Sequence, residues 1–187
     1  MTTALIVIDI QNDYFPGGKM ELVGSDEASA QAHNLLDHFR ATAKPTIHIQ
    51  HISLSKTATF FLPDSEGAKI HSSIAPLTGE TVVVKHFPNS FRETTLLDQL
   101  KALNVDTVII TGMMTHMCVD ATSRAAADFG FKVTVVADAC ATRALTYGET
   151  TIPAEHVHKS FLAALKSYGQ VLSTAEVLAQ LRPHSLS

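Results

Sequence analysis

The chain has 187 residues, of which 45% are hydrophobic, 17% charged and 6% aromatic, with no Trp. This length suits one well-buried domain, expected over residues 1–187, and is short for two. The formal net charge of −4, without a run of like charges, argues against nucleic acid or a membrane surface as a partner.

The first predicted element is a strand over residues 4–10, an apolar run that reaches Asp9 after too few residues for a signal peptide or a membrane span. The two cysteines, Cys118 and Cys140, are too few for a disulfide framework. Without a secretion signal, we expect a reducing, cytoplasmic location in which both are free thiols.

Further apolar runs predict parallel strands over 46–52, 81–85, 107–111 and 132–137, with a last short strand near Val171. Helical patterns fall over 26–43, 93–103, 116–129, 154–166 and 174–181. This alternation predicts an α/β fold of the Rossmann-like kind, a three-layer α/β/α arrangement around a six-stranded, mostly parallel sheet. Segment 53–77 lacks periodicity and is typical of a lid or substrate wall, and the tail 183–187 is expected to fray.

Ligands on such sheets gather beyond the carboxyl ends of the strands, so the residues that close the predicted strands are candidates for function. Asp9 and Lys85 each close an apolar run in this way. A buried carboxylate needs a cation or donors, and Lys85 is a candidate partner for Asp9. An ordinary salt bridge at the strand ends explains these two residues equally well.

Cys118 follows the fourth predicted strand and falls in the first turn of the next helix. There the helix dipole and free backbone N–H groups favour a thiolate, lower its pKa and can stabilise an oxyanion beside the sulfur. This coincidence favours a nucleophile over a buried core cysteine. Cys140 has no helix start after it and is interpreted as structural.

Six segments in order carry a resemblance to a known family: 7–13 (VIDIQND), 83–85 (VVK), 89–91 (NSF), 111–119 (TGMMTHMCV), 122–126 (TSRAA) and 135–139 (VVADA). Together they resemble the isochorismatase-like cysteine hydrolases nearly end to end. The resemblance implies that Cys118 is the nucleophile, Asp9 the general base, and Lys85 the cation that holds Asp9 and lowers the thiol pKa. It also implies a cis peptide bond at Met113–Met114, with the amides of Met114 and Cys118 as the oxyanion hole.

Other side chains are weaker candidates for the substrate pocket, since each could equally be a core or capping residue. The aromatic candidates are Phe15, Phe61, Phe87 and Phe91, and the polar ones are Gln11, Asn12, Thr115 and Tyr147. His116 is placed to line the pocket mouth but badly placed as a base, because residues two apart on a helix diverge.

A metal site is the feature by which nicotinamidases of this family differ, since they carry Asp-x-His and a further His after the second strand. Here His48 and His51 face opposite sides of a strand, and no carboxylate stands beside either in the sequence. We therefore expect neither a metal nor another cofactor.

The leading hypothesis is hydrolysis of a carbon–nitrogen bond in a small amide, ureido or carbamoyl compound through a thioester on Cys118. Vinyl ether hydrolysis of the isochorismatase type, with Asp9 as acid, is one alternative, and a non-catalytic binding or assembly subunit is another. By resemblance we also expect a homo-oligomer, a dimer or higher. Substrate choice is expected to depend on the loops 53–77 and 142–153.

Overall fold

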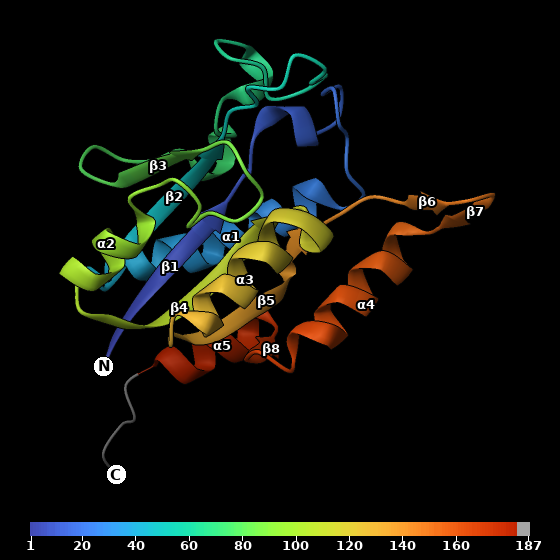
Figure 1. The fold of residues 1–187 in the computed structure, drawn as a ribbon. Helices are drawn as coiled ribbons and strands as arrows, with labels where there is room; N and C mark the ends of the chain where they lie inside the picture. The colour runs from blue at the N-terminus through green and yellow to red at the C-terminus, as the bar shows by residue number, and fades with distance from the viewer. Residues whose placement is uncertain (183–187) are drawn as a thin grey trace.

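A computed structural model describes residues 1–182, and the tail 183–187 lies outside the described residues. Six parallel strands form the central sheet in the order β3-β2-β1-β4-β5-β8 (Figure 1). In chain order they are β1 (Thr2–Ile8), β2 (Thr46–His51), β3 (Thr81–Lys85), β4 (Val105–Met113), β5 (Lys132–Ala141) and β8 (Gln170–Leu172). The α/β prediction with a six-stranded parallel sheet is confirmed.

Helices cover both faces of the sheet. They are α1 (Ser25–Ala41), α2 (Leu96–Ala102), α3 (Asp120–Asp128), α4 (Ala154–Leu165) and α5 (Thr174–Leu181). Side chains of α1 and α5 pack in one hydrophobic cluster, and those of α2, α3 and α4 pack in a second cluster on the opposite face. None of the helices in the described part of the chain is long and apolar enough to cross a membrane.

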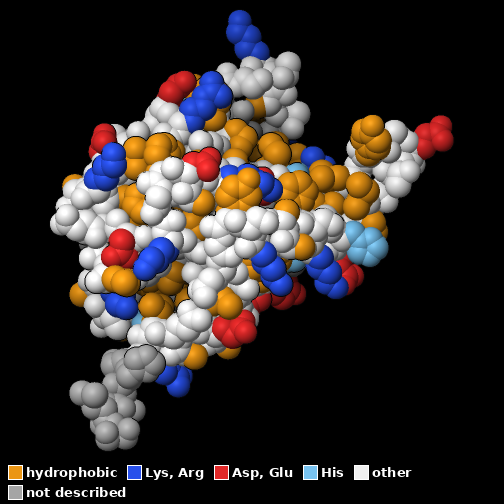
Figure 2. Space-filling view, turned by 60° about the horizontal axis from the view of Figure 1, so that its bottom comes forward, with side chains coloured by type: hydrophobic (Ala, Val, Ile, Leu, Met, Phe, Trp, Pro, Cys, Tyr) orange, Lys and Arg blue, Asp and Glu red, His pale blue; other side chains and the backbone are white. Residues whose placement is uncertain are grey.

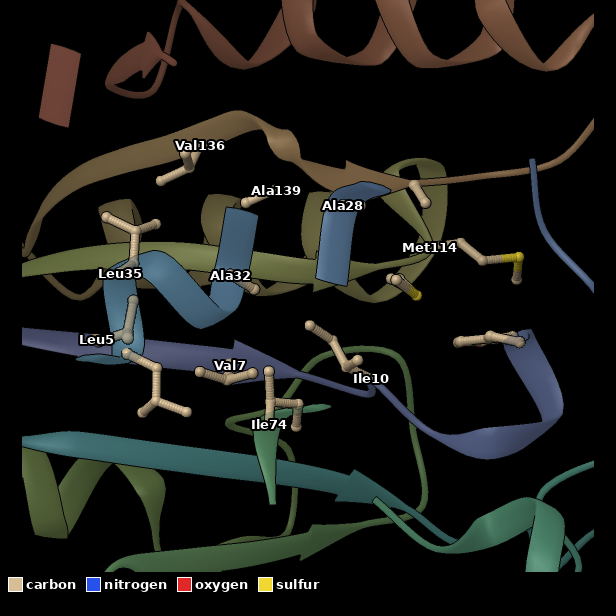
Figure 3. Close-up of a cluster of buried hydrophobic side chains, with 14 of the residues drawn as sticks. Leu5, Val7, Ile10, Ala28, Ala32, Leu35, Ile74, Met114, Val136 and Ala139 are labelled. Atoms are coloured by element: carbon tan, nitrogen blue, oxygen red, sulfur yellow. The ribbon is translucent and has the colours of Figure 1, made fainter. Parts of the chain in front are cut away.

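The run of apolar residues in β1 is continuous because both faces of this strand are buried. Leu5 and Val7 belong to the first cluster, whereas Ile6 and Ile8 belong to the second. Figure 3 shows Leu5 near Leu35 of α1 and Val7 near Ile74. Burying each such side chain contributes about 1.5–3 kcal/mol, which makes β1 the centre of the core.

The carboxyl end of β1 has a distinctive backbone geometry, and it lies against the end of β4. The strand stops at Ile8, two residues earlier than predicted, and Asp9 adopts a left-handed backbone with φ 51°. On the neighbouring strand, Gly112 has φ 134°, and a Cβ there would stand 2.0 Å from the carbonyl oxygen of Ile8. Only glycine fits this contact, which brings the end of β4 against the end of β1.

Two segments that the sequence left as loops contain local structure. The segment 53–77 holds two short 3₁₀ helices, Glu66–Ala68 and Ser72–Ile74. After β5, the strands β6 (Leu145–Tyr147) and β7 (Thr150–Ile152) form an antiparallel hairpin that projects from the body of the molecule (Figure 1). On the face of the molecule drawn in Figure 2, acidic and basic side chains are interspersed.

Candidate active site at the carboxyl end of the sheet

The three residues predicted to carry chemistry meet at one edge of the sheet. Asp9 follows β1, Lys85 ends β3, and Cys118 lies in a π-helical turn, Thr115–Val119, between β4 and α3. Because β2 separates β1 from β3, the long side chain of Lys85 has to extend across the end of β2 to reach Asp9. Parallel strands thus place residues far apart in sequence beside one another.

The Lys85 ammonium group lies at the centre of this arrangement. Its Nζ stands 2.7 Å from Oδ2 of Asp9 and donates a hydrogen bond of 3.3 Å to Sγ of Cys118. Asp9 and Lys85 are fully buried and Cys118 is 5% exposed. Oδ1 of Asp9 is buried without a hydrogen-bond partner among residues 1–182, so this carboxylate retains an oxygen able to accept a proton.

Burial and charge control the protonation of these groups. Burial raises the pKa of the Cys118 thiol far above its ordinary value, and the Asp9 carboxylate raises it further, while Lys85 acts in the opposite direction. Burial lowers the pKa of Lys85, but Asp9 and Cys118 outweigh that effect and the pKa rises. The resting site therefore holds a neutral thiol beside an ammonium group.

The expected low pKa of Cys118 is thus wrong for the resting site. Cys118 lies within the π-helical turn rather than at the first residue of an α-helix, and the sulfur is removed from water. A carboxylate oxygen of Asp9 lies within 4.8 Å of Sγ. Desolvation and this neighbouring negative charge exceed what a helix terminus contributes.

His51 is a fourth residue of the site that the sequence reasoning did not place there. Its Nδ1 lies 2.8 Å from Nζ of Lys85 and 4.0 Å from Oδ2 of Asp9. Burial, and then the Lys85 charge, lowers the pKa of His51 to about 4, so the ring is neutral at physiological pH. An ammonium group can only donate, so Nδ1 accepts and Nε2 carries the proton. His51 ends β2 as Lys85 ends β3, and this shared strand-end position is a signal that the sequence contains.

Gln11 fixes the backbone of His51 rather than contacting a ligand. Its Nε2 donates to the carbonyl oxygens of His51 and Ala68, both at 2.8 Å, and its Oε1 accepts from the amide of His51 at 2.8 Å. Both polar atoms of the Gln11 amide are therefore used by backbone groups, and the prediction of a direct substrate contact is not supported by this geometry.

Three residues of the site have the spacing of metal ligands, but the Lys85 ammonium group lies between them. Ligand atoms of Asp9, His51 and Cys118 lie within 4.8 Å of one another, which is a spacing that suits a divalent ion. The Lys85 ammonium stands between the same three atoms, at 2.7, 2.8 and 3.3 Å. A second cation at this point would repel the first, so these residues do not fit a metal while Lys85 is charged.

The surroundings of the two histidines differ from the sequence-based description. His48 and His51 do have different environments, but each lies near a carboxylate that comes from elsewhere in the chain. His48 contacts Glu80 at 2.9 Å, and His51 lies near Asp9. Glu80 also pairs with Arg40, so His48 belongs to a partly buried network with these two residues.

The turn before Cys118 begins with an unusual peptide bond. The Met113–Met114 peptide bond is cis, and Met114 is the residue before the π-helical turn. Cys118 lies among the first four residues of the continuous helical segment, where N–H groups lack regular intrahelical acceptors. Oγ1 of Thr115 lies 2.8 Å from Nδ1 of His158, so this buried hydroxyl holds the turn against α4.

Of the predicted pocket residues, Phe61 and His116 lie near the site. The Phe61 ring centroid is 5.9 Å from that of His51, and its backbone amide donates to Asp13 at 2.7 Å. Nδ1 of His116 lies 2.6 Å from Oγ1 of Thr142, which ties the π-helical turn to the end of β5.

The remaining predicted pocket residues have other contacts. Phe15 stacks on His71, Phe87 lies under Arg92, Phe91 packs with Phe129 and Phe131, and Asn12 donates to the carbonyl oxygen of Glu66. Tyr147 is 85% exposed on the hairpin. The first four contact neighbouring protein groups, in line with the alternative of core or capping residues, whereas Tyr147 faces solvent.

Tyr14 and Arg143 are two further residues that the sequence did not single out. Tyr14 is 1% exposed, and its ring centroid is 4.6 Å from that of Phe61. Burial raises the pKa of Tyr14, and the Asp9 carboxylate raises it further, whereas Arg143 lowers it. Nothing in the local sequence pattern distinguishes these residues from core or loop positions.

Comparison with known proteins gives close relatives over nearly the whole chain. The isochorismatase domain model matches residues 3–176. An uncharacterized isochorismatase family protein of Bacillus subtilis, YddQ, is 51% identical over 94% of this chain and 98% of its own length. The structure of a protein from Oleispira antarctica, described as an isochorismatase hydrolase, is 47% identical and covers 95% of this chain and 96% of its own, with a TM-score of 0.92.

More distant relatives include proteins that carry the names of hydrolases. The nicotinamidase of Escherichia coli is 28% identical over 73% of this chain and 82% of its own. The maleamate amidohydrolase of Pseudomonas putida is 28% identical over 96% and 86%. A cysteine hydrolase structure from Pseudomonas syringae has 26% identity and a TM-score of 0.89, covering 95% and 91%.

Proposed function

The chain belongs to the isochorismatase family, and from that premise we propose that it is a cysteine hydrolase acting on a small amide, ureido or carbamoyl compound. The bond cleaved is carbon–nitrogen, and the intermediate is a thioester on Cys118. The observation that carries this proposal is the buried Lys85 ammonium between the Asp9 carboxylate and the Cys118 thiol. Relatives named nicotinamidase and maleamate amidohydrolase support the bond type.

The first step transfers the thiol proton of Cys118 to the Asp9 carboxylate as the sulfur attacks the substrate carbonyl carbon. The raised thiol pKa is compatible with this role, because proton removal and attack then occur together. Lys85 stays protonated and stabilises the negative charge on sulfur as it develops. The carbonyl oxygen becomes an oxyanion, for which the amides of Met114 and Cys118 are the proposed donors.

In the second step the tetrahedral intermediate collapses and the carbon–nitrogen bond breaks. Asp9 returns its proton to the departing nitrogen, which leaves as ammonia or an amine, and Cys118 is left as a thioester. Water then attacks the thioester while Asp9 takes one of its protons. Collapse releases the carboxylic or carbamic acid, and Asp9 gives the proton back to the sulfur.

His51 and Gln11 support the cation in this scheme. Because Nδ1 of the neutral His51 ring accepts from Lys85, it directs the ammonium toward both Asp9 and Cys118 without adding charge. Gln11 holds the His51 backbone. We propose that these two are positioning residues, since neither touches the reacting sulfur.

Trapping of the intermediate tests the proposal directly. A panel of small amides and ureido compounds is mixed with the enzyme, ammonia release is followed, and the acyl adduct is sought by intact mass. We expect an adduct and turnover in the wild type and in Cys140→Ala, and neither in Cys118→Ala. Full turnover of a vinyl ether by Cys118→Ala would favour ether hydrolysis, and binding without turnover of any compound would favour a non-catalytic role.

Self-association is also proposed, on the evidence of the β6–β7 hairpin. All three residues of β7 and two of β6 are exposed, including Tyr147. A two-stranded hairpin alone is at best marginally stable in water, so a partner for its apolar side chains is expected. Light scattering of the wild type and Tyr147→Asp measures this, and a monomeric wild type contradicts it.

A further inference from the structure

The π-helical turn that carries Cys118 is fastened to α4 by side-chain contacts. Oγ1 of Thr115, the first residue of the turn, lies 2.8 Å from Nδ1 of His158. The ring centroid of His116, the second residue, is 5.9 Å from that of Phe161. His158 and Phe161 are three residues apart on α4, so they lie on one face of that helix. This face of α4 therefore contacts the first two residues of the turn.

The turn itself has a backbone geometry that is rare in proteins. The carbonyl oxygen of Met114 accepts a hydrogen bond of 3.3 Å from the amide of Val119, five residues further on. This spacing is that of a π-helix, which occurs mostly as single turns and often at functional sites. Because regular helical bonding does not extend through such a turn, contacts from neighbouring elements are expected to set the position of Cys118.

The hydroxyl group of Thr115 has a single hydrogen-bond partner in the described part of the chain. Thr115 is 0% exposed, and within residues 1–182 its hydroxyl group contacts only His158. A buried hydroxyl group without a partner is costly, because it has given up its hydrogen bonds to water. The contact with His158 therefore favours one position of the first residue of the turn.

The ring of His158 joins the turn to an irregular part of β5. One side of the ring lines a cavity of about 250 Å³, which Cys140 also lines, so packing alone does not fix the ring. Between Val135 and Cys140, β5 departs from its regular ladder with β4. The backbone of Ala137, within this bulge, forms a hydrogen bond with the His158 ring. Bulges next to active sites commonly redirect side chains, as this one does for His158.

The His158 ring is neutral at physiological pH. Burial is the largest cause that lowers its pKa, the hydrogen bond with Ala137 opposes this effect, and the Lys159 charge lowers the pKa further. A neutral imidazole has one N–H donor and one accepting nitrogen. With the proton on Nε2, Nδ1 is free to accept from the Thr115 hydroxyl group.

We propose that His158 is a positioning residue for the nucleophile, because its Nδ1 accepts from the Thr115 hydroxyl group and so fixes the turn that carries Cys118. The inference rests on the proposed function, in which Cys118 attacks the substrate. Within residues 1–182, His158 makes no hydrogen bond to Asp9, Lys85 or Cys118, so it acts through Thr115. Loss of the acceptor should displace the thiol while leaving substrate binding in place, which lowers kcat and leaves KM nearly unchanged.

Asn and Leu at position 158 provide a matched test, because their side chains have nearly the same size and shape. In His158→Asn the amide oxygen takes the place of Nδ1, whereas His158→Leu has no acceptor. Thr115→Val removes the hydroxyl group from the other side of the contact. His156→Leu is the control, since His156 is an exposed histidine of the same helix. Steady-state kinetics on an amide substrate gives kcat and KM, and urea denaturation gives the stability of each variant.

We expect kcat to fall about tenfold in His158→Leu, and to stay within about threefold of the wild type in His158→Asn and His156→Leu. Thr115→Val should reproduce the loss. The double variant Thr115→Val/His158→Leu should be no slower than either single variant, because both remove the same contact. Alkylation of Cys118 by iodoacetamide should become faster in His158→Leu but not in His158→Asn, since a displaced turn exposes the buried thiol.

Equal kcat values and equal alkylation rates in the Asn and Leu variants overturn the positioning role, even if both variants are less stable than the wild type. Losses that multiply in the double variant also overturn it, because His158 and Thr115 then act independently. If His158→Leu does not fold, Thr115→Val and Thr115→Ser give the same comparison, since Ser keeps the hydroxyl group. If the wild type hydrolyses no amide, the proposed function fails, and the alkylation rates alone decide whether His158 holds the turn.

Discussion

Replacement of Lys85 by Met is the change whose effect the structure defines most clearly. The variant keeps the aliphatic volume but removes the ammonium that lies 2.7 Å from the fully buried Asp9 carboxylate. Breaking a buried ion pair by removing one partner costs about 3–5 kcal/mol, because the remaining charge is left without compensation. With a total stability of about 5–15 kcal/mol for a typical domain, the loss should be large but not sufficient to abolish folding.

The informative comparison is with a double variant that carries both Lys85→Met and Asp9→Asn. The double variant contains neither charge, so its free energy of unfolding should recover most of what Lys85→Met lost, and the coupling energy should be about 2–4 kcal/mol. Urea denaturation, followed by circular dichroism, measures the free energy of unfolding of the wild type, the two single variants and the double variant. Hydrolysis should be absent from both single variants and from the double variant, since recovery of stability does not restore the catalytic groups.

Two outcomes would refute this reasoning. A cost below about 1 kcal/mol for Lys85→Met would mean that the pair behaves as a solvent-exposed one. Losses that simply add in the double variant would mean that Asp9 and Lys85 do not stabilise each other. As a matched control, Lys159→Met removes an exposed lysine that pairs with Glu155 on α4, and it should cost little.

Further predictions concern the thiol, the strand contact and His51. Asp9→Asn should lower the pKa of Cys118, because it removes the carboxylate that raises it, so alkylation at neutral pH should become faster while hydrolysis is lost; slower alkylation contradicts this. Gly112→Ala should destabilise the fold by more than about 2 kcal/mol in urea denaturation, whereas Gly130→Ala, which meets nothing within 4 Å, should cost about 1 kcal/mol from its positive φ alone. The depressed pKa of His51 means that its contribution to stability is complete above its unfolded pKa of about 6.5 and declines as the pH falls toward about 4. His51→Gln should flatten that part of the curve of stability against pH and lower kcat, and a wild-type slope retained in the variant would exclude His51 as its source.

The positions of the three central residues follow from local patterns in the sequence. Continuous apolar runs indicated strands buried on both faces, and the strand over 81–85 was predicted with its observed bounds. Asp9, Lys85 and Cys118 come at the ends of such runs, and parallel strands bring those ends to one edge. Strand ends are therefore enough to predict which residues meet, because chain order and strand direction are local properties.

The electrostatic state of the site is a property of the folded chain. The sequence suggested a thiol with a low pKa at a helix start, yet in the structure burial and the Asp9 charge raise that pKa. The contacts of Lys85 with His51 and of Gln11 with the His51 backbone join segments 34 and 40 residues apart. Desolvation depends on everything packed around a group, and no local pattern contains that information.

What the sequence determined by itself is the order of elements, the buried strands and the identity of the residues at their ends. Only the tertiary structure decided that Gln11 binds backbone, that Tyr147 points into solvent on a hairpin, and that Nδ1 of His51 lies beside the Lys85 ammonium group. The physical reason is range: strand and helix patterns arise from neighbours along the chain, whereas burial, charge pairing and unsatisfied donors depend on segments that meet only when the chain has folded.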